Sequence, residues 1–468
     1  METMYDWVAE QVDKDIVPMI EDFIRIPNQS RLFDPEWNTN GLQQKACNFC
    51  IDWALKLGIK GLKLELVEDE GKTPLVLGVV DVPDKPTVLM YGHIDKQPPL
   101  TEDWDEGLHP HKPVIRDGKL YGRGAADDGY AFFASMLMVR ALQKHNIQHN
   151  RIVFFFETDE ESGSRDLLYY LQKFKDTVKE PSLVICLDSG CCDYEHLCLT
   201  TTLRGNVVFT VKAEVTYEGV HSGDASGMIP DSYRVLNEML SRFENPKTGR
   251  LPSEFYVNVP SDKYEQAYSM IKQFNGKVDF KFPFLQGVQP MEEDGFKQYM
   301  NRIWSPTLTY IGMQGMPSLN QAGNVLRKST TLRMSLRIPP SLNKVKAKEQ
   351  VEAFFAKQKP INNAKVTVTV DKFGQGFVAP PYSQELKKAI SEASNEFFGK
   401  EAIYYGEGGS IPFINDLATL FPKSQFIVTG TLGPESNAHG PNEMLNLPYM
   451  KKLILSLTKV LAEYAKLN

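Results

Sequence analysis

The sequence predicts an α/β fold in which a mixed sheet with flanking helices is interrupted by an inserted α+β domain. Apolar, strand-like runs such as VLM, IVFFF and LVICL each lead closely to a histidine or an acidic side chain. Four such side chains, at positions 93, 127, 161 and 188, are 34, 34 and 27 residues apart, which suits successive strand–helix units. A fifth, at position 439, follows 251 residues later. This long gap indicates that a second domain is inserted into the first.

The length of the chain supports two domains. Its 468 residues exceed what one hydrophobic core usually holds together. We assign residues 1–204 and 373–468 to a discontinuous first domain and residues 205–372 to the inserted domain. The chain returns to the first domain with helices expected at Ser383–Phe398 and Leu447–Leu467, which flank a strand at Phe426–Thr431.

The inserted domain has its own alternation of strands and helices. The expected elements are a strand at Asn206–Val215, a helix at Ser232–Phe243, a strand at Thr331–Ile338, a helix at Ala347–Ala356 and a strand at Lys365–Val370. Residues 244–328 mix polar, proline and aromatic stretches, including FKFPFLQGVQP, and are interpreted as an elaboration of this domain.

Composition and charge exclude several classes of partner. Hydrophobic residues make up 42% and charged residues 24%, as in ordinary globular proteins, and no run approaches the ~20 apolar residues that cross a bilayer. The net charge of -7, without a dense Lys/Arg tract, argues against nucleic acid as a partner. The acidic, amphipathic start lacks the basic and apolar parts of a secretory signal, so we expect a cytoplasmic protein that binds no membrane.

The six cysteines are too sparse for a disulfide scaffold and are expected to be reduced. Cys47 and Cys50 form a CxxC, but they lie in a helical pattern and no second CxxC completes a four-thiolate zinc site. We interpret them as two cysteines on a helix face.

Five side chains are candidate metal ligands. They are His93 in YGHID, Asp127 in GRGAADD, Glu161 in ETDEES, Asp188 in CLDSG and His439 in NAHG. Ligands of an α/β sheet bind beyond the carboxyl ends of parallel strands, so residues far apart in the chain can meet in one pocket. Zinc accepts imidazole nitrogen and carboxylate oxygen, and two divalent ions held ~3.5–4 Å apart need a bridging carboxylate. We predict two divalent ions, bridged by Asp127.

Two neighbouring residues have the chemistry to support such a centre. Asp95 lies two residues after His93, on the same side of an extended chain, and could hold the second nitrogen of the imidazole. Glu160 and Glu161 are adjacent and diverge, so that one can bind metal while the other takes a proton from the attacking water. We expect Glu160 to be that general base.

Each motif also has a bland interpretation, since a lone histidine after a strand or a pair of glutamates is more often structural. The combination favours a site, because buried ionisable groups are costly without partners. Gly122 and Gly124 do not make a dinucleotide fingerprint, because the third glycine is missing. GEGGSIP lacks the lysine of a phosphate loop; its Gly409 and Ser410 more plausibly let backbone approach a small substrate.

In these motifs the chain resembles the binuclear zinc peptidases and deacylases that include carnosinase-like cytosolic dipeptidases, aminoacylase and glutamate carboxypeptidase. GHID, GRGAADD, EESGS, CLDSG and AHGPNE occur in the family's order. The resemblance implies that the first domain is the zinc peptidase catalytic domain and that the insertion is a lid and dimerisation domain. It implies that His93 and Asp188 hold one zinc, that Glu161 and His439 hold the other, that Asp127 bridges them and that Glu160 is the base.

The resemblance also implies roles in the lid. His221 in GVHSGD and Arg337 in SLRIPP match the family's lid histidine and lid arginine, and Asn324 in AGNVLRKS offers a weaker substrate contact. In the family the histidine reaches the active site of the partner subunit, which implies a homodimer. The chain departs from the family in ETDEE, where Asp159 adds an acid that we expect to tune basicity or metal preference.

The resulting prediction is a metal-dependent hydrolase that cleaves a dipeptide or a C-terminal peptide bond, with zinc, manganese or cobalt as the metal. His221 would stabilise the oxyanion, and Arg337 would pair with the free carboxylate of the substrate. Two alternatives remain open: removal of an acyl group from an amino acid, and a catalytically silent metal-binding scaffold. The presence of Glu160 beside all five ligands argues against the scaffold.

Overall fold

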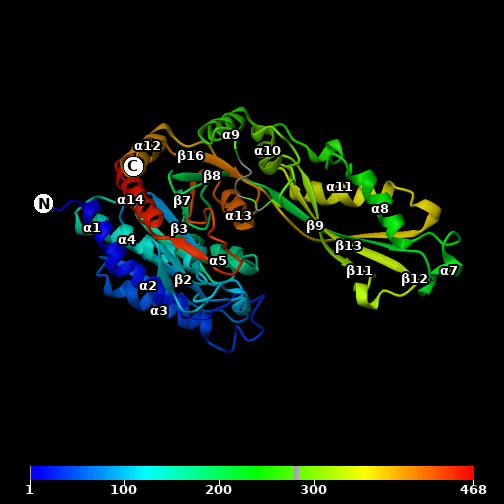
Figure 1. Ribbon diagram of the computed structural model, residues 1–468. Helices are drawn as coiled ribbons and strands as arrows, with labels where there is room; N and C mark the ends of the chain where they lie inside the picture. Colours follow the sequence, from blue (N-terminus) through cyan, green and yellow to red (C-terminus); the bar gives the residue numbers. More distant parts are fainter. Residues whose placement is uncertain (1, 278–281, 283, 468) are drawn as a thin grey trace. The chain divides into compact units, whose positions relative to one another are not determined.

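The computed structural model describes residues 2–277, 282 and 284–467. The chain forms two compact units (Figure 1). Unit 1 comprises Met1–Thr200, Ala379–Tyr404 and Asp416–Asn468, and unit 2 comprises Thr201–Val378 and Tyr405–Asn415. An α/β organisation with an inserted second unit is therefore present, as the sequence predicts.

The unit boundaries differ from the predicted division at residues 201–204 and 373–378, which the structure groups with unit 2, and in one further segment. The prediction placed residues 405–415 in the first domain, whereas the structure groups them with unit 2. Hydrogen bonds account for this: the Tyr299 hydroxyl donates to the Gly406 carbonyl at 3.0 Å, and Arg204 Nε donates to the Gly408 carbonyl at 3.1 Å. The loop that carries Gly409 and Ser410 is thus held by residues of the inserted segment.

The main sheet of unit 1 has six strands in the order β1-β2-β6-β3-β7-β17. They are β1 (Leu62–Val67), β2 (Leu75–Val80), β6 (Arg151–Glu157), β3 (Thr87–His93), β7 (Pro181–Cys186) and β17 (Gln425–Val428). The neighbours β6, β3, β7 and β17 run parallel to one another. At the other edge, β2 pairs with β6 in the antiparallel sense, and β1 pairs with β2 in the same way. The sheet is mixed, as predicted, and its four parallel strands end at one edge.

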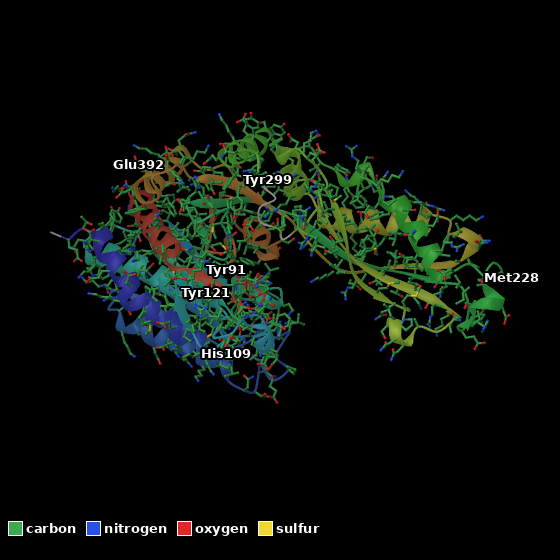
Figure 2. The ribbon with its side chains drawn as sticks, in the orientation of Figure 1. Tyr91, His109, Tyr121, Met228, Tyr299 and Glu392 are labelled. Carbon is green, nitrogen blue, oxygen red and sulfur yellow. The ribbon has the colours of Figure 1, made fainter. Side chains whose placement is uncertain are left out.

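Burial on both faces explains why the central strands are continuous apolar runs. Every residue of β3 and β6 is buried, as expected for strands covered by helices on both sides. Tyr91, labelled in Figure 2, is 1% exposed in β3. The predicted strand at 426–431 is β17, which ends earlier, at Val428.

The helices of unit 1 flank this sheet. They are α1 (Met4–Gln11), α2 (Val17–Ile24), α3 (Leu42–Lys56), α4 (Tyr130–Lys144), α5 (Leu167–Lys173), α6 (Lys175–Val178), α12 (Gln384–Phe398) and α14 (Leu447–Tyr464). The last helix, α14, packs against α1, α4 and α12, so the end of the chain lies beside its beginning (Figure 1). The CxxC cysteines are buried on α3, as the helical pattern predicts. No helix in the described part of the chain has the length and apolar character to cross a membrane.

Two small sheets accompany the main one. The first joins β18 (Met444–Asn446), β5 (Lys119–Tyr121) and β4 (Val114–Arg116). The second joins β15 (Phe377–Val378), β8 (Cys198–Leu203) and β16 (Ile403–Glu407), and the helix α13 (Pro412–Leu420) follows β16. Pairing of Met444 with Tyr121 brings the segments after residues 121 and before 444 together.

Unit 2 is built on a four-stranded antiparallel sheet in the order β11-β13-β9-β14. Its strands are β11 (Thr307–Gln314), β13 (Ser329–Ile338), β9 (Gly205–Glu214) and β14 (Lys365–Gly374). The helices α8 (Ser232–Phe243) and α11 (Lys344–Lys357) pack on the sheet around a buried cluster that includes Phe209, Phe243 and Phe355. These elements match the α+β pattern predicted for the insertion.

The predicted elaboration at 244–328 supplies the helices α9 (Ser261–Gln273) and α10 (Gly295–Ile303) and the edge strand β11, which the sequence pattern did not predict. Residues 278–281 and 283 of this stretch lie outside the described residues. A short two-stranded antiparallel sheet of β10 (Val220–His221) and β12 (Val325–Leu326), with α7 (Ser222–Ala225), lies at the end of the larger sheet where β13 begins (Figure 1).

Candidate metal centre

The carboxyl edge of the main sheet carries most of the candidate ligands. β3 ends at His93, β6 is followed by Glu160 and Glu161, and β7 is followed by Asp188. These three strands are neighbours and parallel, so their ends meet. Asp127 comes from the turn before α4, and His439 from the loop between β17 and β18. The structure brings all five predicted ligands into unit 1.

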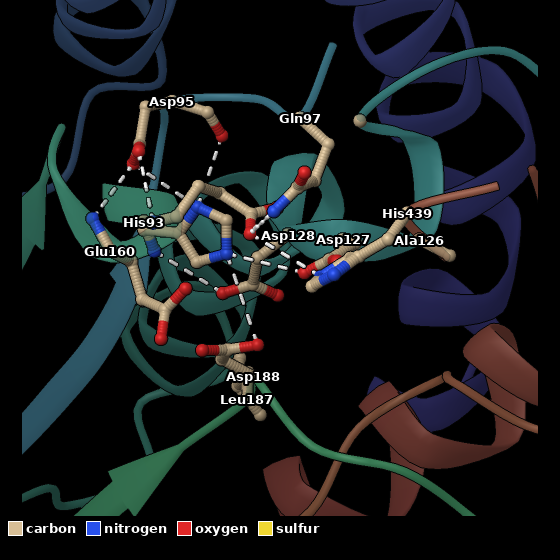
Figure 3. A network of polar contacts seen from close by, with 12 residues as sticks. His93, Asp95, Gln97, Ala126, Asp127, Asp128, Glu160, Leu187, Asp188 and His439 are labelled. Atoms are coloured by element: carbon tan, nitrogen blue, oxygen red, sulfur yellow. Dashed lines mark hydrogen bonds and ion pairs between the residues drawn. The ribbon is translucent and has the colours of Figure 1, made fainter. Parts of the chain in front are cut away.

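The imidazole of His93 is held on one side and faces two carboxylates on the other (Figure 3). Its Nδ1 lies 3.0 Å from the Asp95 carbonyl oxygen and 3.3 Å from Asp95 Oδ1. Its Nε2 lies 3.3 Å from Asp127 Oδ1 and 3.8 Å from Asp188 Oδ1. A nitrogen directed at two carboxylates, with the other nitrogen occupied by a carbonyl, is the arrangement of a metal-binding histidine.

Asp127 lies between the two histidines. Its Oδ1 faces His93, and its Oδ2 lies 3.0 Å from His439 Nε2. The same His439 nitrogen is 3.3 Å from Glu161 Oε2, which accepts a hydrogen bond from Gln97 Nε2 at 2.5 Å. One carboxylate that faces an imidazole with each oxygen has the geometry of a bridging ligand.

These side chains fit divalent metal ions. Two sets of three, His93/Glu160/Asp188 and His93/Asp127/Glu161, have ligand atoms that lie within 4.8 Å of one another. Glu161 Oε1 is buried and has no hydrogen-bond partner among the described residues. Imidazole nitrogen and carboxylate oxygen are the donors that zinc and similar ions accept. A bound cation would satisfy the free oxygen of Glu161.

The electrostatics agree with this fit, since six carboxyl groups crowd around two imidazoles: Asp95, Asp127, Asp128, Glu160, Glu161 and Asp188. Burial raises the pKa of Asp188, and the charge of Glu160 adds to it. Burial and the neighbouring carboxylates also raise the pKa of Glu160 to about 7, although His93 opposes this. Burial would lower the pKa of His93, but the surrounding aspartates raise it well above its usual value. Divalent cations would relieve this repulsion.

Asp95 also fixes the loop that carries both glutamates. Its carboxylate accepts hydrogen bonds from the backbone N–H groups of Glu160, at 3.3 Å, and Glu161, at 3.1 Å. Asp95 thus contacts His93 and the Glu160–Glu161 segment together. We expected only the contact to His93.

Close packing surrounds the ligands. A Cβ built on Gly92 would lie 2.6 Å from Asp128 Oδ2 and 2.7 Å from the Phe156 ring, so only glycine fits directly before His93. Asp128 Oδ2 accepts a hydrogen bond from the His93 backbone N–H at 3.3 Å, and the peptide bond between Asp127 and Asp128 is cis. The sequence interpretation missed Asp128 and Gln97; Asp128 ends the motif GRGAADD, and Gln97 lies two residues beyond the motif YGHID.

Asp159 contacts two arginines, Arg31 and Arg165. Its fully buried carboxylate forms an ion pair with Arg31 Nη2 at 2.9 Å and accepts a hydrogen bond from the Arg165 backbone at 3.0 Å. Burial raises the pKa of Asp159, while the two arginines lower it. The extra acid of ETDEE therefore anchors its own loop through the two arginines, and our expectation that it tunes the metal site has no support in these contacts.

The remaining predicted residues lie in unit 2 and form two sets. In the first, His221 Nδ1 accepts a hydrogen bond from Gly223 N–H at 3.1 Å, and the Asn324 carbonyl accepts one from Ser222 N–H at 3.0 Å. In the second, Arg337 Nη1 donates to Ser410 Oγ at 2.7 Å, next to Gly409. Ser410 Oγ in turn donates to the Arg204 carbonyl at 2.6 Å.

These two sets stand at opposite ends of β13. His221 pairs with Val325, four residues before β13 starts, whereas Arg337 is the last but one residue of that strand. The strand from Ser329 to Arg337 spans roughly 26 Å at about 3.3 Å per residue. The exposed Met228, three residues after α7, lies on the His221 side of unit 2 (Figure 2).

Known proteins share this sequence pattern and fold. The model of peptidase family M20/M25/M40 matches residues 89–465. The cysteinylglycine-S-conjugate dipeptidase of Corynebacterium striatum is 26% identical over 88% of this chain and 88% of its own length. The Beta-Ala-His dipeptidase of Rattus norvegicus is 26% identical over 80% of this chain and 76% of its own length.

A solved structure extends the likeness to the fold. The di-peptidase Dug1p of Saccharomyces cerevisiae superposes with a TM-score of 0.75 at 21% identity, covering 100% of this chain and 99% of that one. The family match covers most of the chain and includes the segments that hold all five candidate ligands. This protein therefore belongs to peptidase family M20/M25/M40.

Proposed function

We propose that the protein hydrolyses dipeptides with the aid of two divalent metal ions, which are zinc, or alternatively manganese or cobalt. One observation carries the proposal: the two oxygens of Asp127 face His93 and His439, and Glu160 stands beside them. The names of the curated relatives point to dipeptides as substrates. Together they favour dipeptides over longer peptides and N-acyl amino acids.

In this proposal, His93 and Asp188 hold one ion, Glu161 and His439 hold the other, and Asp127 bridges them. When bound, the ions polarise the scissile carbonyl and acidify the attacking water. Asp95 keeps Nε2 of His93 directed at the ligand carboxylates by occupying its Nδ1. The side-chain carboxylate of Asp95 holds the backbone of Glu160 and Glu161.

Glu160 is the proposed general base. Its carboxylate takes a proton from the attacking water and delivers it to the leaving amine. Burial, the largest cause of the raised pKa of Glu160, favours this role, because a base with a pKa nearer the working pH can both accept and return a proton. Asp159 does not compete for this role, since Arg31 and Arg165 bind its carboxylate.

Arg337 and Ser410 are the proposed site for the free carboxylate of the substrate. Their hydrogen bond fixes the guanidinium next to the backbone of Gly409, and a planar guanidinium binds a carboxylate through two parallel bonds. Three glycines in the GEGGS loop keep side chains away from this position.

His221, with Asn324 beside it, is proposed to stabilise the oxyanion from a second copy of the chain. Within unit 2 the two sets of residues are separated by the length of β13, roughly 26 Å at about 3.3 Å per residue. A dipeptide is far shorter than this. One substrate can therefore contact both His221 and Arg337 only if they come from different subunits, which supports a homodimer formed through the inserted unit.

We place the enzyme in the cytoplasm. Cys47, Cys50, Cys186 and Cys198 form no disulfide bond, and each is 1% exposed or less. Unpaired cysteines suit a reducing compartment.

A substrate panel tests the proposal. The metal-free protein would be reconstituted with zinc, manganese or cobalt and assayed against dipeptides, tripeptides and N-acyl amino acids. We expect turnover of dipeptides above the other classes. Turnover of N-acyl amino acids alone would replace the peptidase by a deacylase, and no turnover with any metal would favour the silent scaffold.

A further inference from the structure

A buried ion pair lies next to the ligand loops. Arg123 Nη1 donates to Glu443 Oε2 at 2.9 Å, and the side chains of the two residues are 1% and 0% exposed. Burial of two charges is unfavourable unless their remaining polar atoms also find partners. The partners found here are the backbones of three loops that carry the metal-site residues.

Glu443 binds the loop that leads to Asp127. Its Oε2 also accepts a hydrogen bond from Gly124 N–H at 2.9 Å. Its Oε1 accepts from Ala126 N–H at 3.0 Å and from Asp127 N–H at 3.1 Å. Each oxygen therefore receives two donors, and the carboxylate fixes the backbone up to the proposed bridging ligand.

Arg123 binds the other two loops. Its Nε donates to the Pro98 carbonyl at 3.0 Å, in the segment that follows Asp95 and Gln97. Its Nη2 donates to the Gly440 carbonyl at 2.6 Å, directly after His439. The pair thus connects the segments that present His93, Asp127 and His439 without contacting any ligand atom of these side chains.

We propose that Glu443, together with Arg123, is a positioning residue of the metal centre. Its carboxylate holds the amide of Asp127 so that the two Asp127 oxygens face His93 and His439 before a metal ion arrives. This inference rests on the proposed function, because it assumes that these side chains bind metal. It predicts that disturbing Glu443 weakens metal binding more than an equal loss of stability would explain.

Unit 1 offers a matched control at the opposite end of the same strands. Arg151, at the start of β6, is 5% exposed. It donates to Asp81 Oδ1 at 2.8 Å, to Thr87 Oγ1 at 3.0 Å and to the Thr177 carbonyl at 2.7 Å. Arg151 therefore connects three segments as Arg123 does, but none of them carries a candidate ligand.

The experiment compares Glu443→Gln, Arg123→Lys and Arg151→Lys with the wild type. The glutamine keeps the shape of Glu443 but places an NH₂ group against two donors in either orientation. Lysine keeps each positive charge but cannot make three directed contacts. Co²⁺ titration of the metal-free full-length protein, followed by its absorption spectrum, gives the affinity, and thermal unfolding without metal gives the Tm.

We expect Glu443→Gln and Arg123→Lys to bind Co²⁺ about 10- to 100-fold more weakly, as for other residues that orient metal ligands. Arg151→Lys should lower the Tm of the metal-free protein and leave the Co²⁺ affinity unchanged. Wild-type affinity in both Glu443→Gln and Arg123→Lys would overturn the positioning role. If Glu443→Gln does not fold, Arg123→Lys against Arg151→Lys decides the question.

The two proposals fail in different ways. A wild-type protein that binds no Co²⁺ would refute the proposed metal-dependent function. A wild-type protein that binds two ions, with unchanged affinity in both variants, would refute only the positioning role of Glu443.

Discussion

The candidate metal centre and the His221 segment differ in how many contacts hold each of them in place. Asp95, Glu443 and Arg123 fix the backbone around the ligands of unit 1. The side chain of His221 is 69% exposed, and its ring contacts only Gly223 and Asp224 of its own turn among the interactions of the described residues. The candidate metal centre is thus organised within unit 1 alone, whereas the role proposed for His221 requires that another surface meets it.

The largest expected effect comes from a substitution in the candidate metal centre. Asp127→Ala should lose both metal ions and all measurable turnover, because Asp127 is the one carboxylate among the described residues with an ion-pair contact to both His93 and His439. Elemental analysis and activity would be measured on the same sample. One tightly held ion per active wild-type chain would contradict the two-ion centre.

Glu160→Gln should leave both ions bound while it lowers kcat by at least ~10²-fold, because proton transfer is lost and the shape is kept. The matched control is Asp159→Asn, one residue away. This control should lose stability, since Arg31 and Arg165 lose a charged partner, and should keep its kcat. A fully active Glu160→Gln enzyme would assign the base to another residue.

Mixing two inactive variants tests whether His221 acts in the active site of a second subunit. His221→Ala and Glu160→Gln homodimers should each be nearly inactive. After random subunit exchange, roughly a quarter of the wild-type activity should return, because half of the dimers are mixed and one of their two sites is intact. If His221 acts within its own chain, every site still lacks one residue and mixing recovers nothing. Sedimentation of an active monomer would exclude the shared site.

The smallest expected effect concerns how the free energy of unfolding depends on pH. Glu157 is fully buried, accepts a hydrogen bond from the Tyr91 hydroxyl at 2.5 Å, and has its pKa raised by burial from 4.5 to about 8. The folded protein therefore keeps this proton between pH 4.5 and about 8, while the unfolded chain releases it. The free energy of unfolding should fall across this range as pH rises. Glu157→Gln should lack this component, as urea unfolding of the metal-free proteins at several pH values would reveal.

The sequence predicted those parts of the molecule that depend on local pattern. Buried parallel strands are continuous apolar runs, so β3, β6, β7 and β17 and the polar residues after them could be recognised. The α+β character of the insertion followed from the alternation of strand-like and helix-like patterns along that segment. The family resemblance was confirmed by the match over residues 89–465.

Other features depend on contacts that no local pattern encodes. Arg123 and Glu443 are 320 residues apart in the chain, and nothing near either residue indicates the other. Asp159 was expected to tune basicity or metal preference because of its neighbours, but Arg31, from a distant segment, forms an ion pair with its carboxylate. The edge strand β11 was missed because most of its residues are exposed, which removes the alternation that marks a half-buried strand.

The order of the ligands along the chain has a consequence for biosynthesis. His93, Asp127, Glu161 and Asp188 leave the ribosome early, and β1, β2, β6, β3 and β7 can pair without β17, which joins at the edge of the sheet. His439 follows 251 residues after Asp188. At roughly 5–20 residues per second, translation of that interval takes on the order of 10–50 s. A nascent chain thus lacks the proposed ligand His439 throughout the synthesis of most of unit 2, and we expect hydrolytic activity only after the segment from β17 onward has docked.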